Sequence, residues 1–440
     1  MRRALGLAVL LAACAPADAP LHAPREVRHV LLLVLDACHG DQLSCQGGAP
    51  GLTPALDAVA AAGVRFDRAC ADAAWTLPAT TSLLSGLFPE RHGVLTTQQR
   101  APDALELLPE EFAAAGWRTA AFVQMVYASD AYGLQQGFED YRYYGTDQKR
   151  DDQLTADALA WLDAHAAERT FLYVHARRPH GPYNPEVPAL ARQGVHALPS
   201  DERLELLMHA DAQVKDAAEL QPGEAELVGQ LYRANLSTVD ERLAPLLQRA
   251  LAEPSTLLVI TADHGEALGE HGAFGHGSHV WAETLDIPLL VAGAGLSPHV
   301  DHEAAFTVDI VPTLRELCGL PPVAGGDGRS LADRLLQRPA RGAAREPVVV
   351  AARIAGPEDR PDRAVVDGDL VLLLHADGRA QLFDRRADRR QERDLAAERP
   401  ADVARLLRLA EAWSPPAVEG EAPALDEQRT RDLEALGYVK

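Results

Sequence analysis

A run of six apolar residues that ends in an aspartate, Val30 to Leu35 followed by Asp36, most constrains the fold of this chain. Such an uninterrupted apolar run is typical of a strand buried on both faces of a parallel sheet. Similar runs follow at residues 119–123, 170–175, 256–261 and 288–292. Stretches with helical periodicity lie between the runs, at residues 54–62, 101–115, 155–166 and 224–252. This alternation predicts an α/β fold with a doubly wound sheet, whose sites lie at the carboxyl ends of strands.

The pattern changes after residue 335, where an Arg/Ala/Pro-rich linker occupies residues 338–345. Short strand-like runs at residues 347–352, 364–366, 370–375 and 380–383 precede a helical stretch at 400–413. They predict a small C-terminal antiparallel sheet with one helix. The expected domains are a signal peptide at 1–13, a tether at 14–26, a large domain at 27–335, a subdomain at 346–413 and a tail at 414–440.

The N-terminus has the three parts of a bacterial lipoprotein signal. Arg2 and Arg3 precede an apolar stretch at residues 4–13, which leads into Leu-Ala-Ala-Cys ending at Cys14. The stretch is too short to span a bilayer as a helix. Acylation of Cys14 would tether the protein to the membrane by lipid alone. We therefore expect an exported lipoprotein of the bacterial cell envelope, in the periplasm or at the outer membrane; an ordinary cleaved signal peptide is the alternative.

Composition excludes one class of partner. The chain has 42 basic and 64 acidic side chains, a net charge of −22, and a nucleic-acid-binding surface needs the opposite sign. Only three of the basic residues are lysines, Lys149, Lys215 and Lys440. The cysteines other than Cys14 have no metal-type spacing, and they fit buried free thiols better than disulfides.

Polar residues that follow two of the predicted strands point to a metal site. Asp36 ends the first strand, and Asp263 and His264 follow the strand at 256–261. Carboxylates and imidazoles from neighbouring strand ends can converge on one divalent cation, such as Ca²⁺, Zn²⁺ or Mn²⁺. A single aspartate in such a place is often only a loop or cap residue. The histidines that follow, His271, His276 and His279, favour the site instead.

Thr76 is a further candidate site residue, at the start of a predicted helix. Pro78 suits the first turn of a helix and Gly86 its end, so Thr76 is expected at the helix N-terminus. The free N–H groups and the dipole there favour a bound anion. A simple helix cap at Thr76 is the alternative.

These residues stand in motifs that resemble the sulfatase family of the alkaline-phosphatase superfamily. The motifs are LLLVLDACHGDQLSCQG, AWTLPATTSLLSGLFPERHGV, GWRTAAF, FLYVHARRPHGPYNP, TADHGEALGEHGAFGHG, DGRSL and the C-terminal ALGYVK. The resemblance covers residues 27–440. It implies a mixed sheet flanked by helices, a small C-terminal antiparallel-sheet subdomain, and hydrolysis of anionic esters with a bound metal ion.

The resemblance also assigns roles to residues. Asp36, Asp263 and His264 fall on metal-ligand positions, and Thr76 falls on the nucleophile position. His180 matches a histidine near the leaving group, and His276 matches a lysine or histidine that contacts the anionic oxygens of the substrate. Without the resemblance, both would be interpreted as loop histidines. A second metal, held by His276 or His279 with Asp211 or Asp240, stays open.

Several family residues are replaced. Threonine is not converted to formylglycine, the nucleophile of true sulfatases, and Thr80 replaces the arginine four residues after it. Ala37 replaces the second aspartate of the usual pair. A family lysine and histidine fall on Gln124 and Val126, and no lysine lies nearby.

Three functions follow. The first is a metal-dependent hydrolase of sulfate, phosphate or phosphonate esters that uses Thr76, acting on a sulfated or phosphorylated glycan, lipid or small molecule. Thr76, Asp36 and Asp263 favour it. The second is a non-catalytic protein that binds sulfated or anionic glycans, suggested by Gln124 and Ala37. The third is a transferase of a phospho group such as phosphoethanolamine, suggested by the threonine and the tether.

Overall fold

A computed structural model describes residues 26–214, 217–321, 325–339, 341, 345–352, 361–412, 421–436 and 438. The expected signal peptide and Cys14 lie outside these residues. Among the described residues no helix has both the length and the apolar composition to span a membrane. The four cysteines of this part of the chain are free thiols, and three of them are buried.

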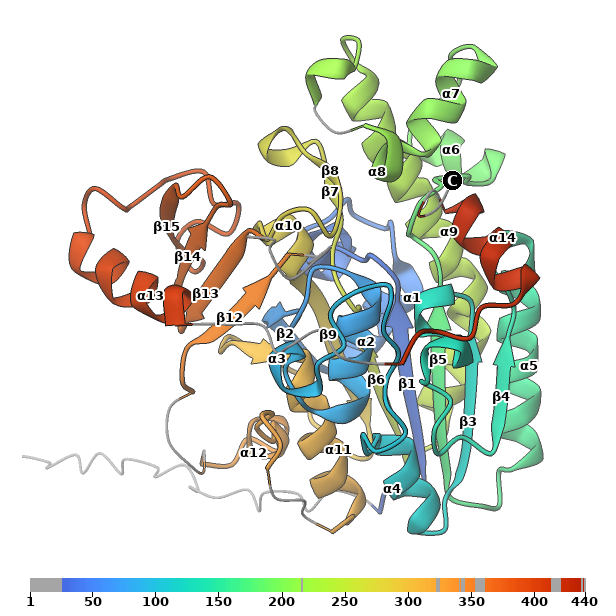
Figure 1. The fold of residues 1–440 in the computed structure, drawn as a ribbon. Coiled ribbons are helices and arrows are strands. Elements are labelled where there is room, and N and C mark those ends of the chain that lie inside the picture. The colour runs from blue at the N-terminus through green and yellow to red at the C-terminus, as the bar shows by residue number, and fades with distance from the viewer. Residues whose placement is uncertain are drawn as a thin grey trace, which may run out of the picture.

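The large domain is built on a mixed sheet of nine strands (Figure 1). Its parallel part has the order β6 (Thr256–Thr261), β1 (His29–Leu35), β5 (Thr170–Ala176), β3 (Arg118–Val123) and β4 (Asp140–Tyr143). Strand β9 (Asp286–Gly293) runs antiparallel between β6 and β2 (Gly63–Cys70), and β10 (His299–Asp301) and β11 (Ala305–Phe306) pair with β2. All seven residues of β1 are buried, as its apolar sequence predicts.

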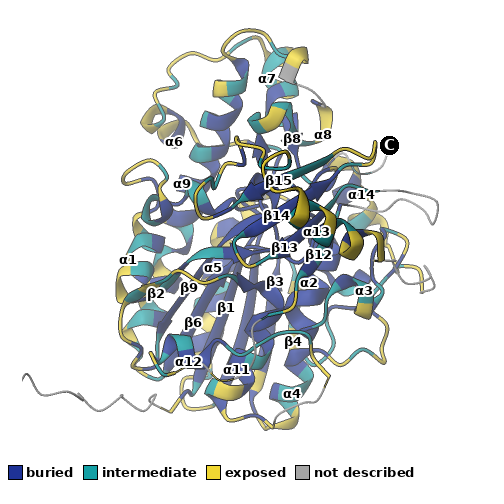
Figure 2. Cartoon of the chain, turned by 90° about the vertical axis from the view of Figure 1, so that its left-hand side faces the viewer, coloured by how far each residue is buried: buried dark blue, intermediate teal, exposed yellow. Residues whose placement is uncertain are grey.

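Helices cover both faces of the sheet, which confirms the doubly wound α/β architecture (Figures 1 and 2). One layer contains α1 (Pro54–Ala62), α5 (Asp151–Ala164) and α9 (Glu224–Ala252). The other contains α2 (Thr76–Ser85), α4 (Leu108–Ala114) and α11 (Ile310–Cys318). The shorter helices are α3 (Pro89–His92), α6 (Val187–Arg192), α7 (Asp201–Met208), α8 (Ala210–Gln213), α10 (Ala282–Leu285) and α12 (Ala332–Leu335).

The C-terminal sheet is an antiparallel meander of β12 (Val348–Ala351), β13 (Arg363–Asp367), β14 (Leu370–Leu374) and β15 (Ala380–Asp384). Its strands alternate between two apolar faces. Val371 and Phe383 pack with Phe306 of the large domain, while Leu372 and Leu382 face α13 (Pro400–Ala412). Both sides of this small sheet are therefore covered, and the expected subdomain is present.

Several elements, β2 among them, differ from the sequence-based expectation. Strand β2 was not predicted, because GVRFDRAC mixes apolar and charged residues. The helix expected at residues 101–115 is limited to α4, where Pro109 occupies the first turn. The expected tail contains α14 (Glu427–Ala435), which returns to the large domain, away from the C-terminal sheet (Figure 1).

Candidate active site

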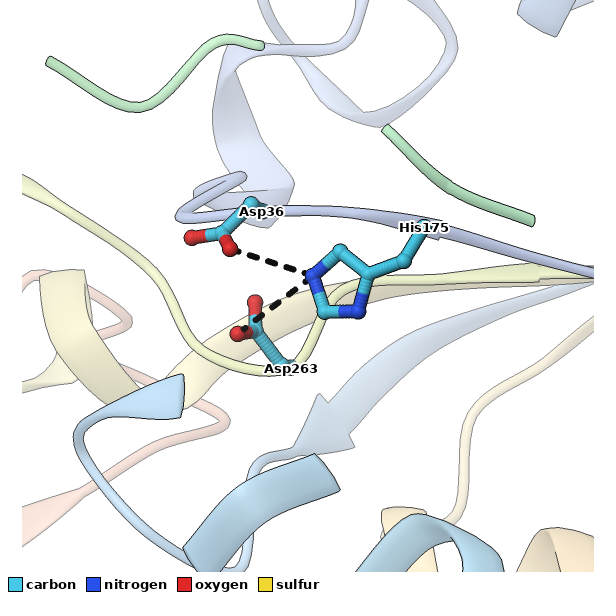
Figure 3. A group of neighbouring side chains, drawn as sticks. All are labelled: Asp36, His175 and Asp263. Carbon is cyan, nitrogen blue, oxygen red and sulfur yellow. Dashed lines mark hydrogen bonds and ion pairs between the residues drawn. The ribbon is translucent and has the colours of Figure 1, made fainter. Parts of the chain in front are cut away.

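Three neighbouring strands bring a cluster of ligand-type side chains together. Asp36 directly follows β1, His175 is the penultimate residue of β5, and Asp263 lies two residues after β6. Because β1 pairs in parallel with both β5 and β6, their carboxyl ends meet at one edge of the sheet. The three side chains are fully buried and offer ligand atoms within 4.8 Å of one another (Figure 3). His175 Nε2 lies 3.1 Å from Asp36 Oδ2 and 3.9 Å from Asp263 Oδ2.

His264 adds a fourth ligand-type group to this cluster. Its Nδ1 lies 2.8 Å from the carbonyl oxygen of Gly265, so Nδ1 carries the hydrogen and Nε2 presents a lone pair. That Nε2 lies 3.4 Å from Asp263 Oδ2 and 3.8 Å from Asp36 Oδ1. Both of these carboxylate oxygens are buried without a hydrogen-bond partner. Lone pairs that converge in this way fit a divalent cation.

The electrostatics of the cluster agree with that fit. Burial, and then the neighbouring Asp263, raise the pKa of Asp36 well above its ordinary value. Burial lowers the pKa of His175 to about 4, so its imidazole is neutral, as a metal ligand must be. Two carboxylates and two imidazoles suit Zn²⁺ or Mn²⁺. The sequence predicted Asp36, Asp263 and His264 but missed His175, although His175 ends the predicted strand at 170–175.

Thr76 reaches the same cluster from the opposite side. It is the first residue of α2, and its Oγ1 lies 3.2 Å from His264 Nε2. Pro78 lies in the first turn, and Gly86 ends the helix in the left-handed conformation with φ of 70°. Its position at a helix N-terminus favours negative charge beside the hydroxyl. The expected placement of Thr76 agrees with this geometry.

The two further histidines lie next to His264 in a row. The ring centroids of His264 and His276 are 4.2 Å apart, and those of His276 and His180 are 4.9 Å apart. His180 Nε2 and His276 Nε2 lie 2.9 and 3.2 Å from the hydroxyl of Tyr438. Their Nδ1 atoms face the carbonyl oxygen of Gly181 at 2.6 Å and Glu266 Oε1 at 2.8 Å. Glu266 and Tyr438 were not among the predicted site residues.

These contacts determine where the protons lie. A carbonyl oxygen only accepts, so His180 Nδ1 donates to Gly181 and its Nε2 accepts from the hydroxyl of Tyr438. That hydroxyl has one proton, so the Nε2 of His276 must donate to it. Burial lowers the pKa of His180 well below its ordinary value, and burial raises the pKa of Glu266 to about 8. His276 is therefore arranged as a proton donor and His180 as an acceptor.

Gln124, which stands where the resemblance places a lysine, has a structural role. Gln124 donates to Asp151 at 2.9 Å, and Arg178 binds the other oxygen of Asp151 at 2.6 Å. Arg177 donates to the carbonyl oxygens of Gly181 at 2.7 Å and Thr146 at 3.3 Å. Both arginines are buried, so these bonds hold the loop that carries His180.

The residues considered for a second metal form no second metal-type group in the described part of the chain. Asp240 accepts hydrogen bonds from the backbone N–H groups of Ala55 and Leu56 at the start of α1, so its role is structural. Asp211 Oδ2 lies 3.8 Å from His180 Nδ1. Within the described ranges, the metal-type group is the one formed by Asp36, His175 and Asp263.

Known proteins share this architecture over most of the chain. The ulvan-active sulfatase of Formosa agariphila is 27% identical over 408 residues, covering 83% of this chain and 76% of that protein. The choline-sulfatase of Rhizobium meliloti is 25% identical over 448 residues, covering 86% and 84%. The crystal structure of the phosphonate monoester hydrolase of Agrobacterium radiobacter matches with a TM-score of 0.70 at 20% identity, covering 88% and 94%, and so shows the same fold.

A further solved structure, of a protein in complex with its substrate D-glucosamine-2-N,6-O-disulfate, matches with a TM-score of 0.70 at 19% identity, covering 88% of this chain and 97% of that one. The Sulfatase family profile itself matches residues 28–320, the segment that contains every strand of the large sheet. The chain belongs to the sulfatase family.

Proposed function

We propose that this protein is a metal-dependent hydrolase of sulfate esters in which Thr76 is the nucleophile. The observation that carries the proposal is the 3.2 Å contact between Thr76 Oγ1 and Nε2 of His264, a nitrogen that also faces the orphaned oxygens of Asp36 and Asp263. A hydroxyl in this place lies at a helix N-terminus and beside four ligand-type side chains. It is therefore in position to attack a substrate held at the same point.

Asp36, His175, Asp263 and His264 are the residues that would hold the metal ion. When bound, such an ion lowers the pKa of a neighbouring hydroxyl and stabilises charge on the group being transferred. The His264 ring is fixed by its bond to the carbonyl of Gly265, and Asp263 Oδ1 accepts the N–H of Ala37 at 3.2 Å. The protein thereby fixes both the ring and the carboxylate before substrate binds.

In the first step Thr76 Oγ1 forms a bond to sulfur while the bond from sulfur to the ester oxygen breaks. The departing oxygen takes the proton on Nε2 of His276, the donor in the histidine row, and leaves as an alcohol. The proton of Thr76 replaces the one that His276 gave up. The product of this step is a sulfate ester of Thr76.

In the second step a water molecule attacks the same sulfur and the bond to Thr76 Oγ1 breaks. One proton of the water restores the hydroxyl of Thr76, and the other leaves with the sulfate. Threonine has no second hydroxyl on its reacting carbon, so the adduct is released by cleavage at sulfur. This distinguishes the proposed route from that of an enzyme with formylglycine.

A phosphate or phosphonate monoester is the second candidate substrate. The same steps apply when phosphorus takes the place of sulfur. The fold similarity to the phosphonate monoester hydrolase of Agrobacterium radiobacter supports this candidate, because that scaffold hosts the phosphonate reaction.

The test is turnover by the metal-loaded protein on 4-nitrophenyl sulfate, phosphate and phenylphosphonate with Zn²⁺, Mn²⁺ or Ca²⁺. We expect Thr76→Ala to lower kcat about 10⁴-fold and Thr76→Ser to retain activity, because serine keeps the hydroxyl. Binding of a sulfated glycan without turnover would favour the non-catalytic alternative. Transfer to an added alcohol or lipid acceptor in preference to water would favour the transferase.

We also propose that the protein is exported and anchored by a lipid on Cys14, as its N-terminal sequence predicts. Mass spectrometry of the mature N-terminus tests this. An acylated cysteine as first residue is expected, and an unmodified N-terminus at another position would contradict the anchor.

A further inference from the structure

The C-terminal motif ALGYVK has no role in the mechanism above, yet its tyrosine lies in the active site. Tyr438 is the residue whose hydroxyl contacts Nε2 of both His180 and His276. It is separated from them by 258 and 162 positions in the chain. The contact is made within one chain, so Tyr438 reaches the active site of the chain that carries it.

The aromatic ring of Tyr438 lies on the side of the nucleophile. Its centroid is 4.9 Å from that of Tyr127, and Tyr127 in turn makes an edge contact with Trp75 at 5.6 Å. Trp75 is the residue before Thr76. Tyr438 therefore fills the space between the two histidines and the residues next to the nucleophile.

The helix α14, which precedes Tyr438, packs on the large domain. The carboxylate of Asp432 accepts hydrogen bonds from the hydroxyls of Tyr143 at 2.6 Å and Thr146 at 3.1 Å. Leu433 and Leu436 are buried in the core of the large domain. These contacts, next to Tyr438 in the chain, hold its hydroxyl at the histidines.

The active site is closed in this arrangement. Thr76 is 1% exposed, and His180 and His264 are 0% exposed. An ester substrate must bring its sulfur to Thr76 and its departing oxygen to His276. The hydroxyl of Tyr438 already occupies the hydrogen-bonding positions that this departing oxygen needs.

We propose that Tyr438 occupies the leaving-group site, so that the C-terminal segment is a built-in competitor of the substrate. This inference rests on the proposed function, because the position on the two histidines is a leaving-group site only in that reaction. The hydroxyl of Tyr438 contacts the two histidines and its ring packs against Tyr127, so this side chain also indicates the shape of the leaving group that the site accepts. The leaving group is a hydroxyl compound with a flat ring of about the size of phenol.

The test compares Tyr438→Ala and Tyr438→Phe with Arg431→Ala, an exposed control on the same segment. Removal of a competitor lowers KM without changing the chemical step. We expect KM for 4-nitrophenyl sulfate to fall about tenfold in Tyr438→Ala, to fall less in Tyr438→Phe, which keeps the ring, and to stay at the wild-type value in Arg431→Ala. An unchanged KM, or a loss of kcat, would overturn the proposal.

A second measurement does not depend on turnover. Diethyl pyrocarbonate modifies accessible imidazoles, and peptide mass spectrometry locates the products. We expect His180 and His276 to react at least about tenfold faster in Tyr438→Ala than in the wild type or Arg431→Ala. Equal rates in all three proteins would show that Tyr438 does not cover the two histidines, even if the protein turns over no ester. A wild type that shows no turnover, together with faster modification in Tyr438→Ala, would refute only the proposed function.

Discussion

Buried aspartates occur in two regions of this molecule, and they are satisfied very differently. At the strand ends, Asp36 and Asp263 each keep a buried oxygen without a hydrogen-bond partner. Below α2, Asp309 accepts from the N–H groups of Arg329 at 2.7 Å and Phe306 at 2.9 Å, and Arg345 pairs with it. Unsatisfied buried charge costs free energy, whereas bonded charge holds neighbouring segments together. The first region therefore fits a bound cation, and the second stabilises the fold.

Substitution at the first region is expected to have the largest effect, and on activity alone. Asp263→Asn keeps the oxygen that accepts from Ala37 but removes a ligand charge, so turnover should fall about 10³-fold or more. The metal-free protein should be at least as stable as the wild type, because a buried carboxylate facing Asp36 is removed. Turnover assays and urea denaturation without metal measure both quantities. A variant that loses stability but binds metal normally would break the comparison.

Substitution at the second region should do the opposite. Asp309→Ala removes the acceptor of the buried N–H of Phe306, of the part-buried N–H of Arg329 and of the guanidinium of Arg345, which should cost about 3 kcal/mol of unfolding free energy. Kcat of the remaining folded protein should be unchanged, because the Asp309 carboxylate binds Phe306, Arg329 and Arg345 and not the metal-type residues. Urea denaturation of Asp309→Ala and Asp309→Asn checks this, and the asparagine should lose less. Equal stability of all three proteins would contradict the structural role.

The fold was predictable where the pattern was local. The buried run before Asp36 and the long periodic stretch of α9 are read directly from the sequence, since strand burial and helical period act over neighbouring residues. Strand β2 was not predicted, because charged residues interrupt its apolar ones and leave no continuous apolar run. The helix α14 was missed because a short polar stretch after a proline-rich segment carries no strong pattern; its burial comes from Leu433 and Leu436 packing on a distant domain.

The candidate site was likewise predictable only for the residues that directly follow predicted strands. Asp36, Asp263 and His264 follow strands, and the carboxyl ends of parallel strands meet, so their convergence was expected from topology. His175 lies inside a strand run, where a histidine is read as a core residue. Tyr438 and Glu266 were missed because only the tertiary structure brings them to His276. Their assigned roles, like that of Thr76, stay predictions.

Asp211 stands between the two kinds of buried aspartate, and its substitution should have the smallest effect. Burial, and then Glu266, raise its pKa to about 8, and its Oδ1 has no hydrogen-bond partner. A folded-state pKa above the unfolded value means that the folded protein holds a proton that the unfolded chain has lost. The resulting stability is fully present below the unfolded pKa and is lost as pH rises through about 8. Stability of the metal-free wild type should therefore fall between about pH 6 and 9.

Asp211→Asn cannot ionise, so it should remove about 2 kcal/mol of that decrease. Urea denaturation at several pH values within this range measures the slope. Glu266, whose pKa burial also raises to about 8, remains in the variant and keeps part of the wild-type decrease. A slope equal to that of the wild type would show that Asp211 is ionised in the folded protein, and it would then belong with the binding carboxylates Asp36 and Asp263 instead of between the two groups.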